Sequence, residues 1–271
     1  METNVLTGGL ANSGSGTLTT QATTQPIPNS VTWSSIVEYS SGSNQEVSLG
    51  TYNNNLILAN GGVKTALGAI DCNGQLNITG VDAGTITEFN METYVLAGGF
   101  TIAGNGFGRF ATNSSDLAPF PSNLDWSNIG EVTLESGCGA MPFGTFNIYR
   151  FEGDGITQLA RNTEGDIESD FVILANLPSN MVTVNILPNN SITCNNILSL
   201  ADASNVLNLK ADATGYGQLK TPSVVGFGSA NITKEFFLDV SSGRWHNIGT
   251  ALTGADLQDL KGDGVMNFSA Y

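Results

Sequence analysis

The sequence predicts an all-β protein, built mainly as a right-handed parallel β-helix. Short runs of β-branched and apolar residues, about four to six residues each, alternate with turns rich in Gly and Asn. Residues 50–79, where the strand pattern is clearest, do not show the apolar period of a helix, which is about 3.6 residues. Only 12% of the 271 residues are charged and 33 residues are Gly, which is typical of a folded chain with many tight turns.

The clearest strand pattern lies in residues 50–79. Three short runs there have alternating or β-branched character, namely 56–58, 65–70 and 76–78. Asn-Gly-Gly separates the first run from the second, and Asn-Gly separates the second from the third. Because Asn and Gly tolerate the left-handed backbone of tight turns, we expect three strands that follow one another closely.

The chain also repeats itself. Residues 1–90 and 91–180 form two copies of one unit, and 181–225 form a partial third copy. Corresponding residues lie 93 or 94 positions apart, and the pairs are Pro26 and Pro119, Pro28 and Pro121, Trp33 and Trp126, and Gly50 and Gly144. At about 20–25 residues per coil, one unit would make about four coils of a solenoid. Met1 matches Met91 of the second copy, so we expect the chain to belong to a longer array.

Two features leave the architecture open at this point. The Pro-x-Pro loop before each repeated Trp is larger than a plain coil needs, which favours tandem β-sandwiches of about 90–100 residues each as the alternative. From about residue 226 the strands become heavier and more charged. We therefore divide the chain into a β-helix region, 1–225, and a β-hairpin, 226–271, that begins a β-sandwich-like C-terminal module.

Charge and cysteine content exclude several functions. The net charge is −15 and the sequence pI is about 4.1, so the surface repels phosphates and we expect no nucleic-acid partner. Cys72, Cys138 and Cys194 are too few and too widely spaced for a disulfide framework or a zinc site. The sequences around Cys72 and Cys194 align, which predicts that both fill the same inward position of a strand. No apolar run reaches transmembrane length, so we do not expect a membrane-embedded chain.

Three acidic residues form the candidate binding site. Asp166, Glu168 and Asp170 alternate along a predicted strand, so their side chains would face one side of it. Glu164 would join them, and Arg161 is the basic residue that accompanies them. A row of carboxylates can bind Ca²⁺ or sugar hydroxyls. The alternative is a solvated acidic face with no ligand.

No catalytic constellation is recognisable in the sequence. His246 is the only histidine, and no Gly-x-Ser-x-Gly turn before a helix accompanies it. We therefore predict no enzymatic activity and no cofactor, with Ca²⁺ as the one ion that the acidic row could hold. The alternative is a β-helical polysaccharide lyase or hydrolase, in which clustered acidic residues on one coil face, here Asp166, Glu168 and Asp170, would carry the reaction.

Two stretches resemble a known family. Residues 39–79 contain Gly-Thr-Tyr-Asn-Asn-Asn-Leu-Ile-Leu, Gly-Gly-Val-Lys-Thr-Ala-Leu and Cys-Asn-Gly-Gln-Leu-Asn-Ile-Thr, which resemble a repeat of Bacteroidota cell-surface proteins. Residues 206–248 contain Val-Leu-Asn-Leu-Lys-Ala-Asp-Ala-Thr-Gly-Tyr-Gly-Gln-Leu and Gly-Arg-Trp-His-Asn-Ile, which are similar to the segment that follows this repeat. The second copy matches less well, because residues 162–170 depart from the apolar pattern.

The resemblance implies a location and a role. Proteins of this family are large, secreted and often adhesin-like, and they are exported by type IX secretion. We therefore expect an extracellular, cell-surface stalk or adhesin segment that takes part in surface attachment or gliding. Its expected partners are surface glycans, other cell-surface proteins and the secretion machinery. No C-terminal sorting domain is recognisable in the 271 residues, so the secretion route is implied by the resemblance alone.

Overall fold

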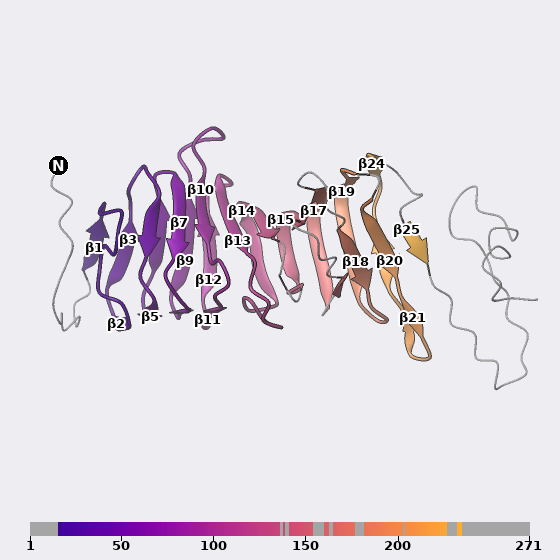
Figure 1. Cartoon of the computed structure of the whole chain (residues 1–271), viewed down its shortest axis with the longest axis horizontal. Helices are drawn as coiled ribbons and strands as arrows, with labels where there is room; N and C mark the ends of the chain where they lie inside the picture. Colours follow the sequence, from indigo (N-terminus) through magenta and orange to yellow (C-terminus); the bar gives the residue numbers. More distant parts are fainter. Residues whose placement is uncertain are drawn as a thin grey trace, which may run out of the picture.

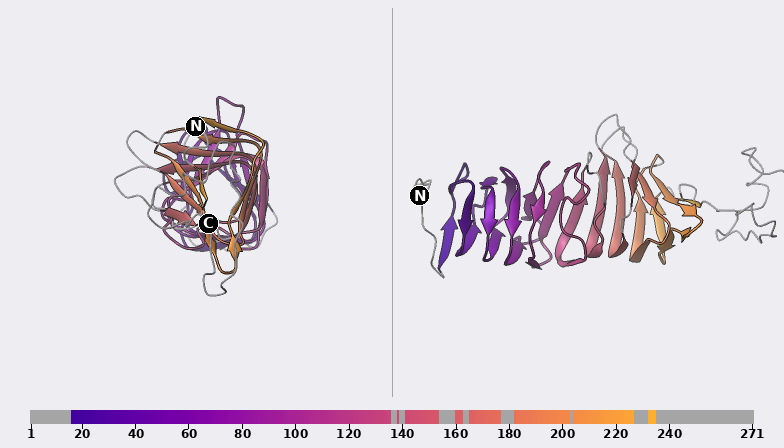
Figure 2. Two further views of the ribbon diagram at one scale, coloured as in Figure 1. Left: turned by 90° about the vertical axis from the view of Figure 1, so that its right-hand side faces the viewer. Right: turned by 90° about the horizontal axis from the view of Figure 1, so that it is seen from below.

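The chain is a rod of stacked β-strands. The computed structural model describes residues 16–135, 138, 141–153, 160–162, 165–176, 182–202, 204–226 and 232–234. These residues form strands and turns and contain no helix. The strands lie side by side along the rod (Figure 1), and the view along its axis shows that they surround a common centre (Figure 2). In this part of the chain, no helix could cross a membrane.

Strands from successive coils pair into sheets that run the length of the rod. In the first half of the chain, strands three apart in sequence order pair, apart from β1 and β3, so each full coil gives one strand to each of three sheets. The first sheet contains β1 (Thr17–Thr20), β3 (Ile36–Tyr39), β6 (Leu56–Ala59), β9 (Gln75–Thr79) and β12 (Thr101–Gly104). The second contains β2 (Val31–Trp33), β5 (Gly50–Tyr52), β8 (Ile70–Cys72) and β11 (Leu96–Ala97).

The third sheet has ten strands and links both halves of the chain. Its strands are β4 (Gln45–Val47), β7 (Gly62–Ala66), β10 (Thr87–Asn90), β13 (Gly108–Thr112), β14 (Leu124–Leu134), β15 (Gly144–Gly153), β17 (Asp166–Asn176), β19 (Ser191–Leu200), β23 (Gln218–Lys220) and β24 (Val224–Gly226). A fourth sheet contains β16 (Ala160–Asn162), β18 (Thr183–Ile186), β20 (Val206–Leu209) and β25 (Ile232–Lys234). The hairpin of β21 (Ala211–Asp212) and β22 (Gly215–Tyr216) projects from the rod (Figure 1).

Parallel pairing decides between the two predicted architectures. Every pair of named strands in the described residues is parallel, apart from β21 and β22. Leu56 pairs with Leu76 in the first half, whereas Ser191 pairs with the more distant Gln218 in the second, so the coils lengthen along the chain. These residues make about eight turns. The predicted parallel β-helix is confirmed, and the alternative of tandem β-sandwiches is wrong, because β-sandwiches are built from antiparallel sheets.

The C-terminal boundary lies mostly outside the described residues. β25 pairs in parallel with β20, with Leu207 opposite Ile232, so the stacking continues at least to Lys234. Residues 235–271, which include His246, are not described, and the β-sandwich-like module stays a prediction.

Inward side chains form one continuous core along the axis. The core forms because successive side chains of each short strand point alternately inward and outward. In β9, Leu76 and Ile78 are buried and their neighbours are half-buried. The largest buried aromatic side chains are Trp33, Tyr39, Tyr52, Phe89, Phe110, Phe120, Trp126, Tyr149 and Phe151. Rings from successive coils contact each other edge to face, as between Phe89 and Phe110, whose centroids lie 5.9 Å apart.

The two sequence repeats have the same strand register. Trp33 pairs with Tyr52 in the first repeat, and Trp126 pairs with Phe146 in the second. Four coils, marked by β2, β5, β8 and β11, precede the equivalent strand β14, which agrees with the four coils predicted per unit. The inward row that begins with Trp33 and Tyr52 in the first repeat therefore recurs as Trp126 and Phe146 in the second.

In each repeat, a glycine lies where the backbones of two neighbouring coils come close together. Gly50 has φ +150° and Gly144 has φ +156°. A Cβ atom on Gly50 would lie 2.5 Å from the carbonyl oxygen of Val31, and one on Gly144 would lie 2.4 Å from that of Leu124. No real Cβ atom tolerates such contacts, so both positions require glycine.

The predicted burial of the cysteines is confirmed, but Cys72 and Cys194 lie in the inward row at different coils, because the equivalent of Cys72 in the second repeat is Ser169. Cys72, Cys138 and Cys194 are buried free thiols. Cys72 follows Tyr52 in the inward row of the first repeat, and Cys194 follows Ser169 in that of the second. Burial raises the pKa of the Cys72 thiol to about 11, so this side chain fills the core as a small apolar group.

Candidate functional site

A row of polar side chains lies on the outer face of the second sheet. Thr32 on β2, Thr51 on β5 and Asp71 on β8 are partners on successive coils, in the outward position next to a buried residue. We call these three residues row 1. Because neighbouring strands lie about 4.8 Å apart, row 1 runs along the rod axis with one side chain per coil.

Row 1 lies in a shallow groove. The groove has a volume of about 330 Å³, which is within the range of small-ligand sites. Leu49 and Val95, from the turns before β5 and β11, contribute apolar surface. Gly50 belongs to the lining and has no side chain to fill the space. The outward-facing lining residues other than Leu49 and Val95 are small or polar, namely Ser30, Thr32, Thr51, Ala69, Asp71 and Ala97.

Asp71 supplies the charge of this groove. No other acidic residue, and no Lys or Arg, is among the residues that line it. Its side chain is half-buried, and its carboxylate accepts no hydrogen bond and forms no ion pair with any residue that the structure describes. Asp71 is not among the buried side-chain atoms that lack a partner, so its carboxylate reaches solvent and is available to a ligand.

The second repeat carries an equivalent row. Asp125 on β14, Thr145 on β15 and Glu168 on β17 are partners on successive coils, and all three residues are exposed. We call them row 2. Thr145 follows Gly144 as Thr51 follows Gly50, and Glu168 pairs with Thr145 as Asp71 pairs with Thr51. The predicted site residue Glu168 therefore occupies the position of Asp71 in the other repeat.

The predicted acidic residues lie where their alternation places them. Asp166 and Glu168 are exposed and Asp170 is half-buried, all on the outer side of β17. Each accepts a hydrogen bond from β19: Ser191 Oγ lies 2.7 Å from Asp166 Oδ1. The amide nitrogen of Asn195 lies 3.3 Å from Glu168 Oε1 and 3.4 Å from Asp170 Oδ1.

A metal site would need several ligand side chains placed close together. No group of three or more His, Cys, Asp or Glu residues is placed to hold a metal ion within the described part of the chain. Glu164 and the side chain of Arg161, which were expected beside the acidic row, lie outside the description. Ca²⁺ binding therefore stays a prediction.

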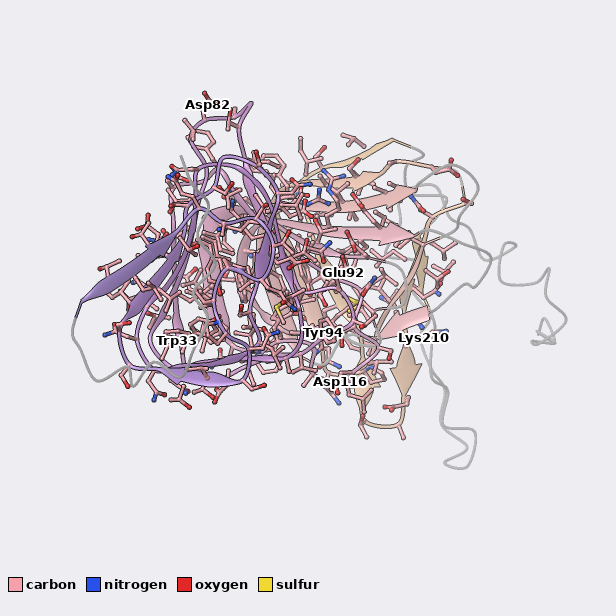
Figure 3. All side chains as sticks on the ribbon, turned by 60° about the vertical axis from the view of Figure 1, so that its left-hand side comes forward. Trp33, Asp82, Glu92, Tyr94, Asp116 and Lys210 are labelled. Carbon is pink, nitrogen blue, oxygen red and sulfur yellow. The ribbon has the colours of Figure 1, made fainter. Side chains whose placement is uncertain are left out.

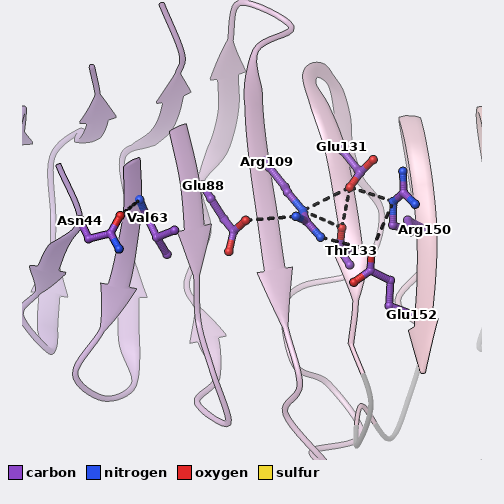
Figure 4. A network of polar contacts seen from close by, with 8 residues as sticks. All are labelled: Asn44, Val63, Glu88, Arg109, Glu131, Thr133, Arg150 and Glu152. Carbon is purple, nitrogen blue, oxygen red and sulfur yellow. Dashed lines mark hydrogen bonds and ion pairs between the residues drawn. The ribbon is translucent and has the colours of Figure 1, made fainter. Parts of the chain in front are cut away.

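A second charged feature crosses the ten-stranded sheet (Figure 4). Arg109 on β13 forms ion pairs with Glu88 at 3.2 Å, with Glu131 at 3.2 Å and with Glu152 at 3.5 Å. Arg150 on β15 forms ion pairs with Glu131 at 3.0 Å and with Glu152 at 3.7 Å. We call these five residues the Arg–Glu network. It joins four successive coils through their side chains.

The Arg–Glu network holds more carboxylates than guanidinium groups. Burial is the main cause that raises the pKa of Glu88; Arg109 opposes it, and the carboxylates of Glu152 and Glu131 add to the rise. Burial also raises the pKa of nearby Glu135, with Glu88 adding to it. The arginines already contact carboxylates, so the network stabilises this face of the sheet.

The sequence did not reveal Asp71 as a site residue. The coil from Thr145 to Glu168 is longer than the coil from Thr51 to Asp71. Aligning Ile70-Asp71-Cys72 with Ile167-Glu168-Ser169 would therefore have required a gap inside the repeat. The shared Gly-Thr-aromatic-Asn motif was the signal from which that alignment could have started.

Hydroxyl groups beside carboxylates define what the two rows can bind. A threonine hydroxyl donates and accepts hydrogen bonds, and an ionised carboxylate accepts them. Together they suit a ligand with many hydroxyl groups.

No known protein family, no curated protein and no solved structure matches the chain.

Proposed function

We propose that the chain is a non-enzymatic stalk or adhesin segment of a large extracellular bacterial surface protein, exported by type IX secretion and used in surface attachment or gliding. The observation that carries this proposal is the repeated outer row, Thr32–Thr51–Asp71 and Asp125–Thr145–Glu168, on a rod with one continuous core. In a solenoid each coil packs mainly on its neighbours, so the fold provides length and a long side surface.

Composition and resemblance support the same proposal. A net charge of −15 keeps a long chain soluble and discourages binding to other polyanions. Residues 39–79, which carry the resemblance to Bacteroidota surface repeats, lie in successive coils of the rod. The partners proposed are surface glycans or other cell-surface proteins, together with the secretion machinery during export.

A β-helical polysaccharide lyase or hydrolase is the second candidate, and one observation favours it. In the Arg–Glu network, Glu131 and Glu152 both contact Arg150, and Glu88 has a raised pKa. Glycosidases need one carboxyl group with a raised pKa near a second, ionised carboxylate.

One pair of assays separates the two candidates. The full chain is applied to a glycan array, and the same glycans are then incubated with it and tested for new reducing ends and for unsaturated products. Binding without product supports the adhesin. Product formation that Glu131→Gln or Glu168→Gln abolishes would establish the enzyme instead.

Export needs its own experiment. The full-length gene product is tagged and expressed in a Bacteroidota host with and without a working type IX system. Protease treatment of intact cells should remove the tag signal only when the system works. A protected signal in both strains would contradict the proposed location.

A further inference from the structure

We propose that rows 1 and 2 are two binding sites for a neutral polysaccharide, at corresponding positions of the two repeats. This inference rests on the proposed adhesin function, because it names the ligand class that the outer surface would hold. It is carried by the groove, by the unpartnered carboxylate of Asp71 and by the recurrence of the same row in the second repeat.

The shape of the groove favours an extended ligand. Thr32, Thr51 and Asp71 lie on three successive coils, so the row spans about 10 Å along the rod. The groove is shallow and open because Gly50 lies at its centre and most of the outward-facing residues that line it are small. Leu49 and Val95 offer apolar surface for the carbon-bound hydrogens of a sugar ring, beside hydroxyl and carboxylate groups for its polar substituents.

Charge selects a neutral polymer. The lining of the groove at row 1 contains Asp71 and no Lys or Arg, and row 2 contains Asp125 and Glu168. With a net charge of −15, the chain repels uronate, sulfated and phosphate-containing polymers. Neutral sugars instead present hydroxyl donors to the carboxylates and hydroxyl acceptors to Thr51 and Thr145.

The repeat makes the surface bivalent. Thr51 and Thr145 lie four coils apart, which is about 19 Å along the axis. Row 1 belongs to the second sheet and row 2 to the ten-stranded sheet, and each row runs along that axis, so we expect a polymer longer than this separation to reach both sites. Row 1 is expected to bind more tightly, because Glu168 already accepts a hydrogen bond from Asn195 whereas Asp71 accepts none from the described residues. Engaging both sites raises the apparent affinity for a long chain well above that of either site.

The test uses the full chain and an array of neutral and uronic-acid hexasaccharides. The best neutral hexasaccharide is then titrated by calorimetry against the parent chain and against Asp71→Asn, Glu168→Gln and the double variant. We expect two sites in the parent, loss of the tighter site in Asp71→Asn and of the weaker site in Glu168→Gln. We expect at least tenfold weaker binding in the double variant. For the corresponding long polysaccharide, each single variant should also bind at least tenfold more weakly.

Two further variants keep the result interpretable. Asp82→Asn is the matched control, because Asp82 is an exposed aspartate on the loop between β9 and β10 that projects from the rod (Figure 3). It should bind like the parent. Ala69→Trp fills the groove at row 1 from an exposed position and should remove the tighter site without changing thermal unfolding.

The possible failures are distinguishable. The inference is overturned if uronic-acid hexasaccharides bind better than neutral ones, if no neutral hexasaccharide binds, or if the double variant binds like the parent. Binding that survives in the double variant would leave the adhesin proposal intact and place its site elsewhere. Cleavage of the glycan would overturn the adhesin proposal itself.

Discussion

The phenolic oxygens of Tyr39 and Tyr52 lie 2.9 Å apart inside the rod, on adjacent coils. The backbone N–H of Ser48 donates to Tyr39 Oη at 3.0 Å, and Tyr52 Oη donates to the carbonyl of Ser48 at 2.6 Å. The hydroxyl of Tyr39 must therefore donate to Tyr52, which closes a ring of three hydrogen bonds. Burial raises the pKa of Tyr39 to about 12, so both rings stay protonated at neutral pH.

Removing one hydroxyl should break this ring of hydrogen bonds. In Tyr39→Phe, the N–H of Ser48 loses its acceptor inside the core and Tyr52 loses its donor. We expect the free energy of unfolding to fall by about 1–3 kcal/mol, measured by urea denaturation. Tyr94→Phe is the control, because Tyr94 is 39% exposed and should change stability by less than about 0.5 kcal/mol. Equal effects of the two substitutions would contradict a role for the ring.

The repeated glycine should be required at both of its positions. Gly50→Ala and Gly144→Ala each force a Cβ atom against a carbonyl oxygen, so we expect each to lower the free energy of unfolding by about 1–3 kcal/mol. Gly99→Ala is the matched control, because a Cβ atom there would meet nothing within 4 Å. It should be neutral or stabilise the chain by up to about 1 kcal/mol. If Gly50→Ala unfolds at the same urea concentration as Gly99→Ala, the close approach does not constrain the fold.

Local patterns were enough to predict the architecture. Alternation of apolar residues and Asn-Gly turns predicted the strands, and the recurrence of Trp33 as Trp126 predicted a unit of four coils. Alternation also predicted that Asp166, Glu168 and Asp170 share the outer side of one strand. These features depend on residues that are close in sequence.

Contacts between coils were not predictable, because coil length varies. Near the start of the rod, Val37 pairs with Leu56. Further along, Ser191 pairs with Gln218, and more residues of the chain separate this pair than separate Val37 from Leu56. A single sequence does not reveal these lengths, so neither row 1 nor the Arg–Glu network could be assembled from it. The same uncertainty hid the equivalence of Asp71 and Glu168.

The Arg–Glu network should stabilise the junction between the two repeats. The side chain of Arg109 is 23% exposed and contacts three carboxylates. Arg109→Gln removes this positive charge, so the repulsion between the carboxylates of Glu88, Glu131 and Glu152 is less well offset. We expect a loss of about 1–3 kcal/mol in the free energy of unfolding, smaller at high salt. Lys220→Gln, at an exposed position, is the control and should have an effect below about 0.5 kcal/mol.

A double-mutant cycle isolates the pair at the centre of this network. The coupling between Arg109→Gln and Glu131→Gln should lie between about 0.5 and 3 kcal/mol, because the two side chains touch at 3.2 Å and share Thr133. Additive effects of the two substitutions would show that the ion pair adds no stability.

Lys64 should make stability depend on pH. Its side chain is fully buried, and Nζ donates hydrogen bonds to the carbonyl oxygens of Ser41 at 2.5 Å and Ser43 at 3.2 Å. Burial lowers the pKa of Lys64 from 10.5 to about 8. Between these two values the unfolded chain binds a proton that the folded chain does not bind. The free energy of unfolding should therefore rise with pH above about 8, and this contribution is lost as the pH falls through 8.

Lys64→Met tests this dependence, because methionine fills similar space and does not titrate. Urea midpoints are compared between about pH 7.5 and 9.5, below the range in which tyrosines of the unfolded chain ionise. The raised pKa values of Cys72 and Tyr39 act with the opposite sign, lowering stability as the pH rises above about 9 and about 10 respectively. Both groups are present in the parent and in Lys64→Met, so the readout is the difference between the two profiles. The parent should gain stability relative to Lys64→Met across the range, and Lys220→Met, changed at an exposed lysine, should follow the parent. Parallel profiles for the parent and Lys64→Met would show that Lys64 stays protonated in the folded chain, held by the carbonyl groups of Ser41 and Ser43.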